Sequence, residues 1–176
     1  MGVPRVKDVS IYYGTMFGNA EHYARRLAHE IMTQRRLRVT VHDLDAFDET
    51  SLLDPSSLAP SRLYVYIVST HFAGSPSLTA ERFCRWIETL DNRSPDGNIS
   101  PAAPPRSVST KRFNRRRTNR HPFSFLRHPN HPLKGMHYAV FGIGDSIYLT
   151  YNAVGKFVDY TLNHLARDSL SRARTR

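Results

Sequence analysis

Residues 13–20 of this chain read Tyr13-Gly14-Thr15-Met16-Phe17-Gly18-Asn19-Ala20. They follow an apolar run at 9–13 and lead into a segment, 19–35, whose apolar residues recur with helical spacing. A strand that passes through glycine, hydroxyl and amide residues into a helix is typical of a phosphate-binding loop, because backbone N–H groups and the helix dipole both point at the anion. The loop matches neither the dinucleotide fingerprint nor the Walker pattern. It therefore predicts a site for a mononucleotide phosphate.

Periodic segments along the chain alternate between strand and helix. The pattern predicts strands at 7–13, 37–44, 63–69 and 137–143, and helices at 19–35, 77–90 and 151–165, with a polar stretch and one short turn after residue 44. Such alternation predicts an α/β fold with a parallel sheet, right-handed crossovers and helices on both faces. Ligands bind such sheets beyond the carboxyl ends of the strands, where the strand order reverses. We therefore expect the loops after the first, third and fourth strands to meet at one site.

The net charge of +10 comes from two segments, because residues 1–90 and 132–166 are each neutral. Residues 91–131 hold nine basic and two acidic side chains with six prolines, and residues 167–176 hold four basic and one acidic. The first segment has no helical or strand period, so we expect it to be a disordered insert in one domain, 1–166, followed by a basic tail. An arginine-rich segment of this kind either binds nucleic acid through phosphates or only solvates a loop, and we favour the second interpretation.

The single cysteine limits the chemistry of this chain. One thiol excludes an internal disulfide framework and any multi-cysteine metal or iron–sulfur site made by this chain alone. Cys84 lies in helical phase with Phe83 and Ile87, which predicts a buried structural residue. No apolar run reaches the roughly 18 residues of a transmembrane helix, and the start of the chain lacks a signal-peptide pattern. We therefore expect a soluble cytoplasmic protein without membrane contacts.

Two later loops extend the pattern of the first. Residues 69–76 read Ser-Thr-His-Phe-Ala-Gly-Ser-Pro, and residues 141–148 read Phe-Gly-Ile-Gly-Asp-Ser-Ile-Tyr. Together with residues 13–19 they resemble the three FMN-binding loops of the flavodoxin-like family. One subfamily is resembled in particular, the flavodoxin domain of radical-SAM tRNA 4-demethylwyosine synthases, which make the wybutosine precursor. The segments that carry this closer resemblance are residues 80–88, 133–146 and 154–159.

The resemblance implies a particular architecture. The expected fold is a three-layer sandwich whose parallel sheet has the strand order 2-1-3-4. The family continues with a fifth strand and a fifth helix, for which residues 167–176 offer no apolar alternation. The chain therefore resembles a truncated member, with the fourth strand left as an open edge.

The resemblance also implies a set of cofactor-binding residues, with no catalytic residue and no metal ligand in this chain. Thr15, the backbone at residue 16 and Asn19 would hold the FMN phosphate. The loops at 70–74 and 142–148 would enclose the isoalloxazine ring, with Tyr148 stacked on one face and His71 or Phe72 on the other. The full expected set is Thr15, Met16, Phe17, Gly18, Asn19, Ala20, Thr70, His71, Phe72, Gly74, Gly142, Gly144, Asp145 and Tyr148.

The implied function is electron transfer with FMN as the cofactor and no metal or iron–sulfur cluster in this chain. The flavin would deliver single electrons to a radical-SAM iron–sulfur centre during wybutosine synthesis, so the chain would be the flavodoxin part of an enzyme whose catalytic half lies elsewhere. The expected partners are that radical-SAM domain, an NADPH-linked reductase as electron donor, and tRNA through the basic insert.

Two alternatives remain open. One is the FMN domain of a diflavin reductase, and the other is an interaction or RNA-binding module that has lost its flavin. The arginine-rich insert and four residues that differ from the family pattern support the second alternative. The family has a hydroxyl residue at the position of Phe17, Tyr and an acidic residue at those of His71 and Ala73, and Asn at that of Asp145.

Overall fold

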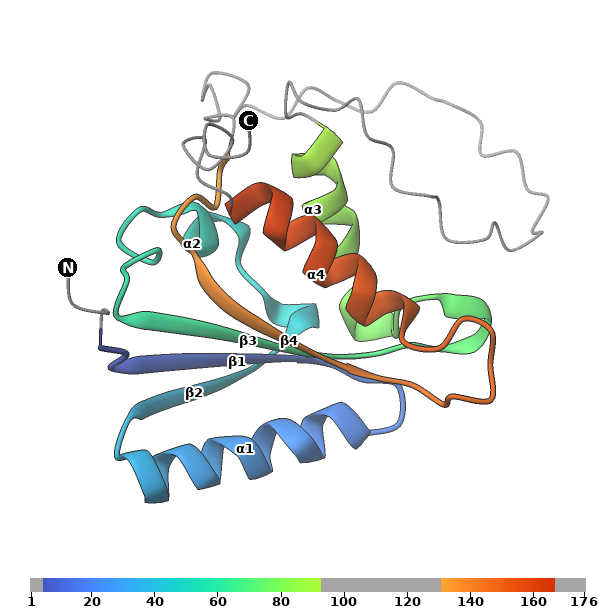
Figure 1. Cartoon of the computed structure of the whole chain (residues 1–176), viewed down its shortest axis with the longest axis horizontal. Coiled ribbons are helices and arrows are strands. Elements are labelled where there is room, and N and C mark those ends of the chain that lie inside the picture. Colours follow the sequence, from blue (N-terminus) through green and yellow to red (C-terminus); the bar gives the residue numbers. More distant parts are fainter. Residues whose placement is uncertain (1–4, 93–130, 167–176) are drawn as a thin grey trace, which may run out of the picture.

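The computed structural model describes residues 5–92 and 131–166, which form a four-stranded parallel sheet with helices on both faces (Figure 1). The strands are β1 (Asp8–Gly14), β2 (Arg38–Asp43), β3 (Arg62–Ser69) and β4 (His137–Ile143), in the order β2-β1-β3-β4. This confirms the predicted fold class and strand order. Apart from residues 91, 92 and 131, the predicted insert lies outside the described residues, as does the tail at 167–176.

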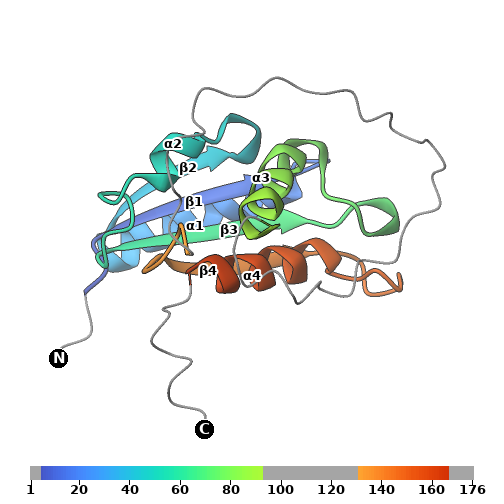
Figure 2. The same cartoon turned by 90° about the horizontal axis from the view of Figure 1, so that it is seen from above.

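Helices lie on both faces of the sheet, with α1 (Asn19–Arg35) on one side and α3 (Glu81–Asn92) and α4 (Ala153–Ala166) on the other (Figures 1 and 2). The small buried residues Ala20, Ala24 and Ala28 let α1 pack closely on the sheet. The stretch after β2, for which only one short turn was predicted, holds a 3-10 turn at Leu44–Ala46 and the short helix α2 (Glu49–Leu53). None of the described helices is long and apolar enough to cross a bilayer.

The core between β3 and α3 is built from aromatic rings. Phe83 is fully buried and stacks on Tyr66, with 5.0 Å between ring centroids, and it meets Phe47 edge to face at 5.4 Å. Cys84 is buried beside this cluster, and burial raises the pKa of its thiol to about 12. The prediction that Cys84 is a buried structural residue is confirmed.

Two neighbouring tyrosines of β3 offer a matched test of this core. The Tyr66 hydroxyl is buried without a hydrogen-bond partner among the described residues, whereas the Tyr64 hydroxyl donates to the Ser57 carbonyl oxygen at 2.8 Å. We expect Tyr66→Phe to raise the free energy of unfolding by about 1 kcal/mol, since it removes an unpaired buried polar group, and Tyr64→Phe to lower it by a similar amount. Urea unfolding of both variants measures the difference, and equal effects of the two substitutions would contradict it.

Like β2 on the opposite side, strand β4 is an open edge of the described sheet. It pairs with β3 on one side only, in a register that sets Phe141 beside Ile67. Ile67 is buried, whereas Phe141 is 55% exposed, because α1 packs over β1, β2 and β3. The Tyr23 ring of α1 lies 6.3 Å from that of Phe141 at this border. Among the described residues no fifth strand covers the edge.

Candidate functional site

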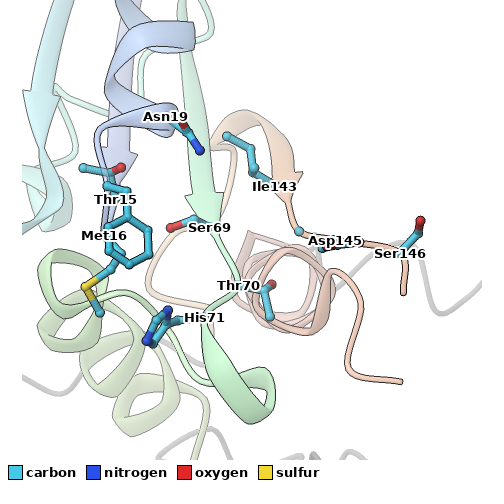
Figure 3. Close-up of a pocket in the computed structure, with 11 residues that line it drawn as sticks. Thr15, Met16, Asn19, Ser69, Thr70, His71, Ile143, Asp145 and Ser146 are labelled. Carbon is cyan, nitrogen blue, oxygen red and sulfur yellow. The ribbon is translucent and has the colours of Figure 1, made fainter. Parts of the chain in front are cut away.

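A cavity of about 500 Å³ lies at the carboxyl ends of β1, β3 and β4 (Figure 3). This volume is within the range of small-molecule sites. Figure 3 shows side chains of the first loop on one side and those of the β4 loop on the other, with residues from α1 and from the end of β3 between them. The lining residues are Thr15, Met16, Phe17, Asn19, Ser69, Thr70, His71, Ile143, Gly144, Asp145 and Ser146. The three loops expected to meet at the switch point of the sheet therefore surround one cavity.

The first loop leaves the start of α1 free to receive an anion. Gly18 is the N-cap of the helix, with a φ of 86° that disfavours side chains, and no side chain caps the helix. The first N–H groups of a helix have no intrahelical acceptors and carry its positive partial charge. The Thr15 hydroxyl oxygen accepts from Gly18 N–H at 2.9 Å, which leaves the Thr15 O–H to donate. The side chain of Phe17 is 81% exposed and does not fill this position.

The first loop is held by the 3-10 turn Leu78–Ala80, which directly precedes α3. Thr15 N–H donates to the Thr79 hydroxyl oxygen at 2.9 Å. The Thr79 hydroxyl in turn donates to the Thr15 carbonyl oxygen at 3.3 Å. A side chain at Gly14 would place its Cβ 2.5 Å from that of Ala80, so only glycine allows this close approach. Sequence reasoning missed Thr79, because nothing local indicates a contact across 64 positions.

The second loop is joined to the other two. Thr70 N–H donates to the Ile143 carbonyl oxygen at 2.8 Å, and the Ser69 hydroxyl donates to the Gly14 carbonyl oxygen at 3.0 Å. His71 follows and lines the cavity, with its ring centroid 6.0 Å from that of Phe17 in an edge-on contact. These contacts hold the ends of β1, β3 and β4 at fixed separations.

Eight of the fourteen sequence-predicted residues line the cavity: Thr15, Met16, Phe17, Asn19, Thr70, His71, Gly144 and Asp145. Two predicted ring contacts, Phe72 and Tyr148, do not line it, and their side chains are 79% and 60% exposed. Gly18, Ala20, Gly74 and Gly142 also stand outside the lining, and Ala20 is fully buried where α1 packs on the sheet.

The expected set did not name Ser69, Ile143 and Ser146, although Ile143 and Ser146 belong to the loop 142–148 that was expected to enclose the ring. Ser69 and Ile143 are the last residues of β3 and β4, so the strand ends themselves contribute to the site as well as the loops. Their position at the carboxyl ends of two predicted strands was the signal that could have found them.

The chemistry of the lining suits a phosphate beside a neutral ring system. Asp145 is the only carboxylate among the lining residues, and one of its oxygens accepts from Ile147 N–H at 3.0 Å and so closes a turn. The other polar groups are hydroxyls, the Asn19 amide and the His71 imidazole. Within residues 5–92 and 131–166, no three His, Cys, Asp or Glu side chains are grouped to hold a metal ion.

Comparison with known proteins gives two groups of curated relatives. The S-adenosyl-L-methionine-dependent tRNA 4-demethylwyosine synthases of Danio rerio and Homo sapiens are 30% and 31% identical to this chain over 155 residues. Those matches cover 88% of this chain but only 17% and 16% of the relatives. The NADPH–cytochrome P450 reductase of Emericella nidulans is 26% identical over 167 residues, covering 95% of this chain and 20% of that protein. The chain thus spans about a fifth or less of the length of these relatives.

Solved structures and a family profile agree on the fold. Oxidised flavodoxin 1 from Bacillus cereus superposes with a TM-score of 0.56 at 17% identity, covering 92% of this chain and 78% of that one. The sequence profile of the flavodoxin family matches residues 11–172. That match spans all three cavity loops and every strand but the start of β1. The chain belongs to the flavodoxin family.

Proposed function

We propose that this chain binds FMN in the cavity between the three loops and transfers electrons through it. The observation that carries the proposal is the meeting of three loops around one cavity at an uncapped helix N-terminus. Free backbone N–H groups at this end of α1 suit a phosphate dianion, and a mostly uncharged lining suits an isoalloxazine ring. Bound FMN would supply chemistry in which electrons enter in pairs and leave singly.

The residues divide into a phosphate end and a ring end. The Thr15 hydroxyl, the first N–H groups of α1 and the Asn19 amide would hold the phosphate, because all three belong to the first loop and the helix start (Figure 3). Met16 and His71 would lie against one side of the ring and residues 143–145 against the other. Tyr148 follows this last segment, three residues beyond Asp145, and would reach the ring only if its exposed side chain turned inward.

The electron acceptor that the relatives favour is a radical-SAM iron–sulfur centre acting in wybutosine synthesis. The support is the identity of 30–31% to tRNA 4-demethylwyosine synthases, against 26% to the reductase. In this role the present chain supplies electrons, and the catalytic residues belong to the radical-SAM part. A test is whether this chain, loaded with reduced FMN, supports cleavage of S-adenosylmethionine by a synthase variant lacking its own flavodoxin domain. Electron transfer to a cytochrome P450 but not to that variant would favour the reductase alternative.

The cofactor itself is tested by purification. We expect the chain, mixed with FMN and passed through a size-exclusion column, to elute with the visible flavin spectrum at one FMN per protein. A folded protein, shown by circular dichroism, that retains no flavin at tens of micromolar FMN would leave only the non-redox alternative.

His71 provides a test of the ring end. We expect His71→Ala to weaken FMN binding roughly threefold to tenfold, since a stacked ring contributes about 0.5–1.5 kcal/mol. His29→Ala is the control, because it removes the same side chain from an exposed position on α1 that does not line the cavity. Quenching of flavin fluorescence measures both dissociation constants, and equal values for the two variants would remove His71 from the site.

A further inference from the structure

Asn152 occupies an unusual backbone position directly before α4. Its φ is 54°, and it is one of only three non-glycine residues with a positive φ in the described part of the chain. Asparagine tolerates this left-handed conformation better than most residues. Its carbonyl oxygen accepts from Lys156 N–H at 3.0 Å, so the left-handed residue begins the hydrogen bonding of the helix.

The side chain of Asn152 fills a slot between β4 and α4. A Cβ added at Gly142 on β4 would lie 1.6 Å from Asn152 Oδ1, and one added at Gly155 on α4 would lie 2.2 Å from the same atom. The two glycines therefore leave the space that this amide occupies. Strand and helix meet through the amide, which sets the distance between them.

The packing carries a cost that an apolar side chain would avoid. Asn152 Oδ1 is buried and has no hydrogen-bond partner among the described residues. An unpaired buried polar atom is destabilising, and such atoms in native structures call for a reason. If the slot only had to be filled, an apolar side chain would do so without this cost. The left-handed backbone conformation, which asparagine tolerates, explains why asparagine stands here.

That turn connects two walls of the cavity. The backbone nitrogen of Asn152 lies 3.1 Å from where a Cβ at Gly144 would be, so it packs against the β4 loop. Two residues later, Val154 N–H donates to the Thr70 hydroxyl at 3.2 Å, which joins the start of α4 to the β3 loop. Thr150, two residues earlier, packs against Gly74 of the β3 loop, with its Cβ 3.0 Å from where a Cβ there would be.

We propose that Asn152 is a positioning residue that holds the β3 and β4 loops in the arrangement that binds FMN. The proposal rests on the proposed function, because FMN is the ligand whose ring these loops would enclose. Asn152 does not line the cavity and acts through Thr70 and residues 143–146, which do.

Asn152→Gly separates the side chain from the backbone conformation, because glycine adopts a positive φ without strain. We expect FMN affinity, measured by flavin fluorescence quenching, to fall by about tenfold or more as the loops lose their fixed separation. Arg36→Gly is the matched control, since Arg36 has a φ of 53° and is exposed at the end of α1 opposite the cavity. We expect this control to bind FMN within about twofold of the unmodified chain, inside the spread of remote surface changes.

Hydrogen exchange of the FMN-free protein distinguishes positioning from general packing. Asn152→Gly should speed amide exchange in residues 70–74 and 143–151 and leave β1 and α1 unchanged. In addition, Gly142→Ala should be severely destabilising in the unmodified chain and much less so beside Asn152→Gly, because the smaller residue frees the space that the new methyl needs.

Several outcomes would overturn the proposal. Unchanged FMN affinity in Asn152→Gly would do so and leave the proposed function standing. Weaker binding without faster loop exchange, or faster exchange throughout the sheet, would do so as well, because the effect would then not act through the loops. If the unmodified chain itself binds no FMN, the proposed function fails. The rate of amide hydrogen exchange in the β3 and β4 loops still decides whether Asn152 holds the two loops together.

Discussion

Phe83→Ala is expected to lower the free energy of unfolding by about 3–5 kcal/mol, the usual cost of removing a buried aromatic ring. The ring is fully buried and contacts Tyr66, Phe47 and Trp86, so its loss leaves a cavity bounded by other large rings. These rings are held by β3, by α3 and by the 3-10 turn after β2, so we expect them not to collapse into the space. Because small domains are stable by about 5–15 kcal/mol in total, a large part of the population would unfold on mild warming.

Urea or thermal unfolding followed by circular dichroism measures this loss. Met32→Ala on α1 is the control, because that side chain is 47% exposed and surface substitutions change stability by about 0.5 kcal/mol or less. A loss below about 1 kcal/mol for Phe83→Ala would contradict the packing between β3 and α3 described above.

This core also positions the cavity. Phe83 joins α3 to β3, and β3 ends in Ser69, which lines the site. The segment that leads into α3 carries Thr79, which holds Thr15 in the first loop. We therefore expect a loss of core packing to weaken ligand binding as well as stability.

The sequence predicted best those features that arise from local pattern. Residues 19–35 and 137–143 form a helix and a strand with the expected bounds, because apolar spacing and flanking glycines determine both. The strand order followed from the resemblance, and the convergence of the loops from the topology of parallel sheets. The short helix α2 was missed because its five residues are too few to show a helical period.

Contacts between distant residues were beyond sequence reasoning. That Tyr148 stacks on the ring stays a prediction: its residue is exposed and outside the cavity lining, whereas His71, also expected beside the ring, lines the cavity. The direction of a side chain in a loop depends on turns such as the one that Asp145 closes, and composition does not determine them. No role was predicted for Asn152 from the sequence. Its side chain lies between Gly142 and Gly155 only because β4 and α4 pack together in the fold.

Thr15→Asp is expected to weaken FMN binding by about a hundredfold or more. The substitution replaces a hydroxyl donor with a carboxylate at the start of the loop that would hold the phosphate dianion. Loss of a hydrogen bond to a charged group costs about 1.5–3 kcal/mol, and repulsion between the two negative groups adds to it. A change of about 2.7 kcal/mol corresponds to a hundredfold in the dissociation constant. Gln34→Glu is the control, because it adds the same charge at an exposed position near the far end of α1.

Riboflavin, which lacks the phosphate, shows whether the charge acts at the phosphate end. The unmodified chain should prefer FMN to riboflavin strongly, since the free N–H groups at the start of α1 have no anion to bind in riboflavin. In Thr15→Asp this preference should shrink by about tenfold or more. FMN affinity falls by about a hundredfold or more, whereas riboflavin affinity changes by no more than about the threefold to tenfold expected for one neutral contact. An equal loss for both ligands would mean that the substitution disturbs the whole loop, and the first turn of α1 would no longer be assigned to the phosphate. A preference that persists in Thr15→Asp would place the phosphate elsewhere in the cavity.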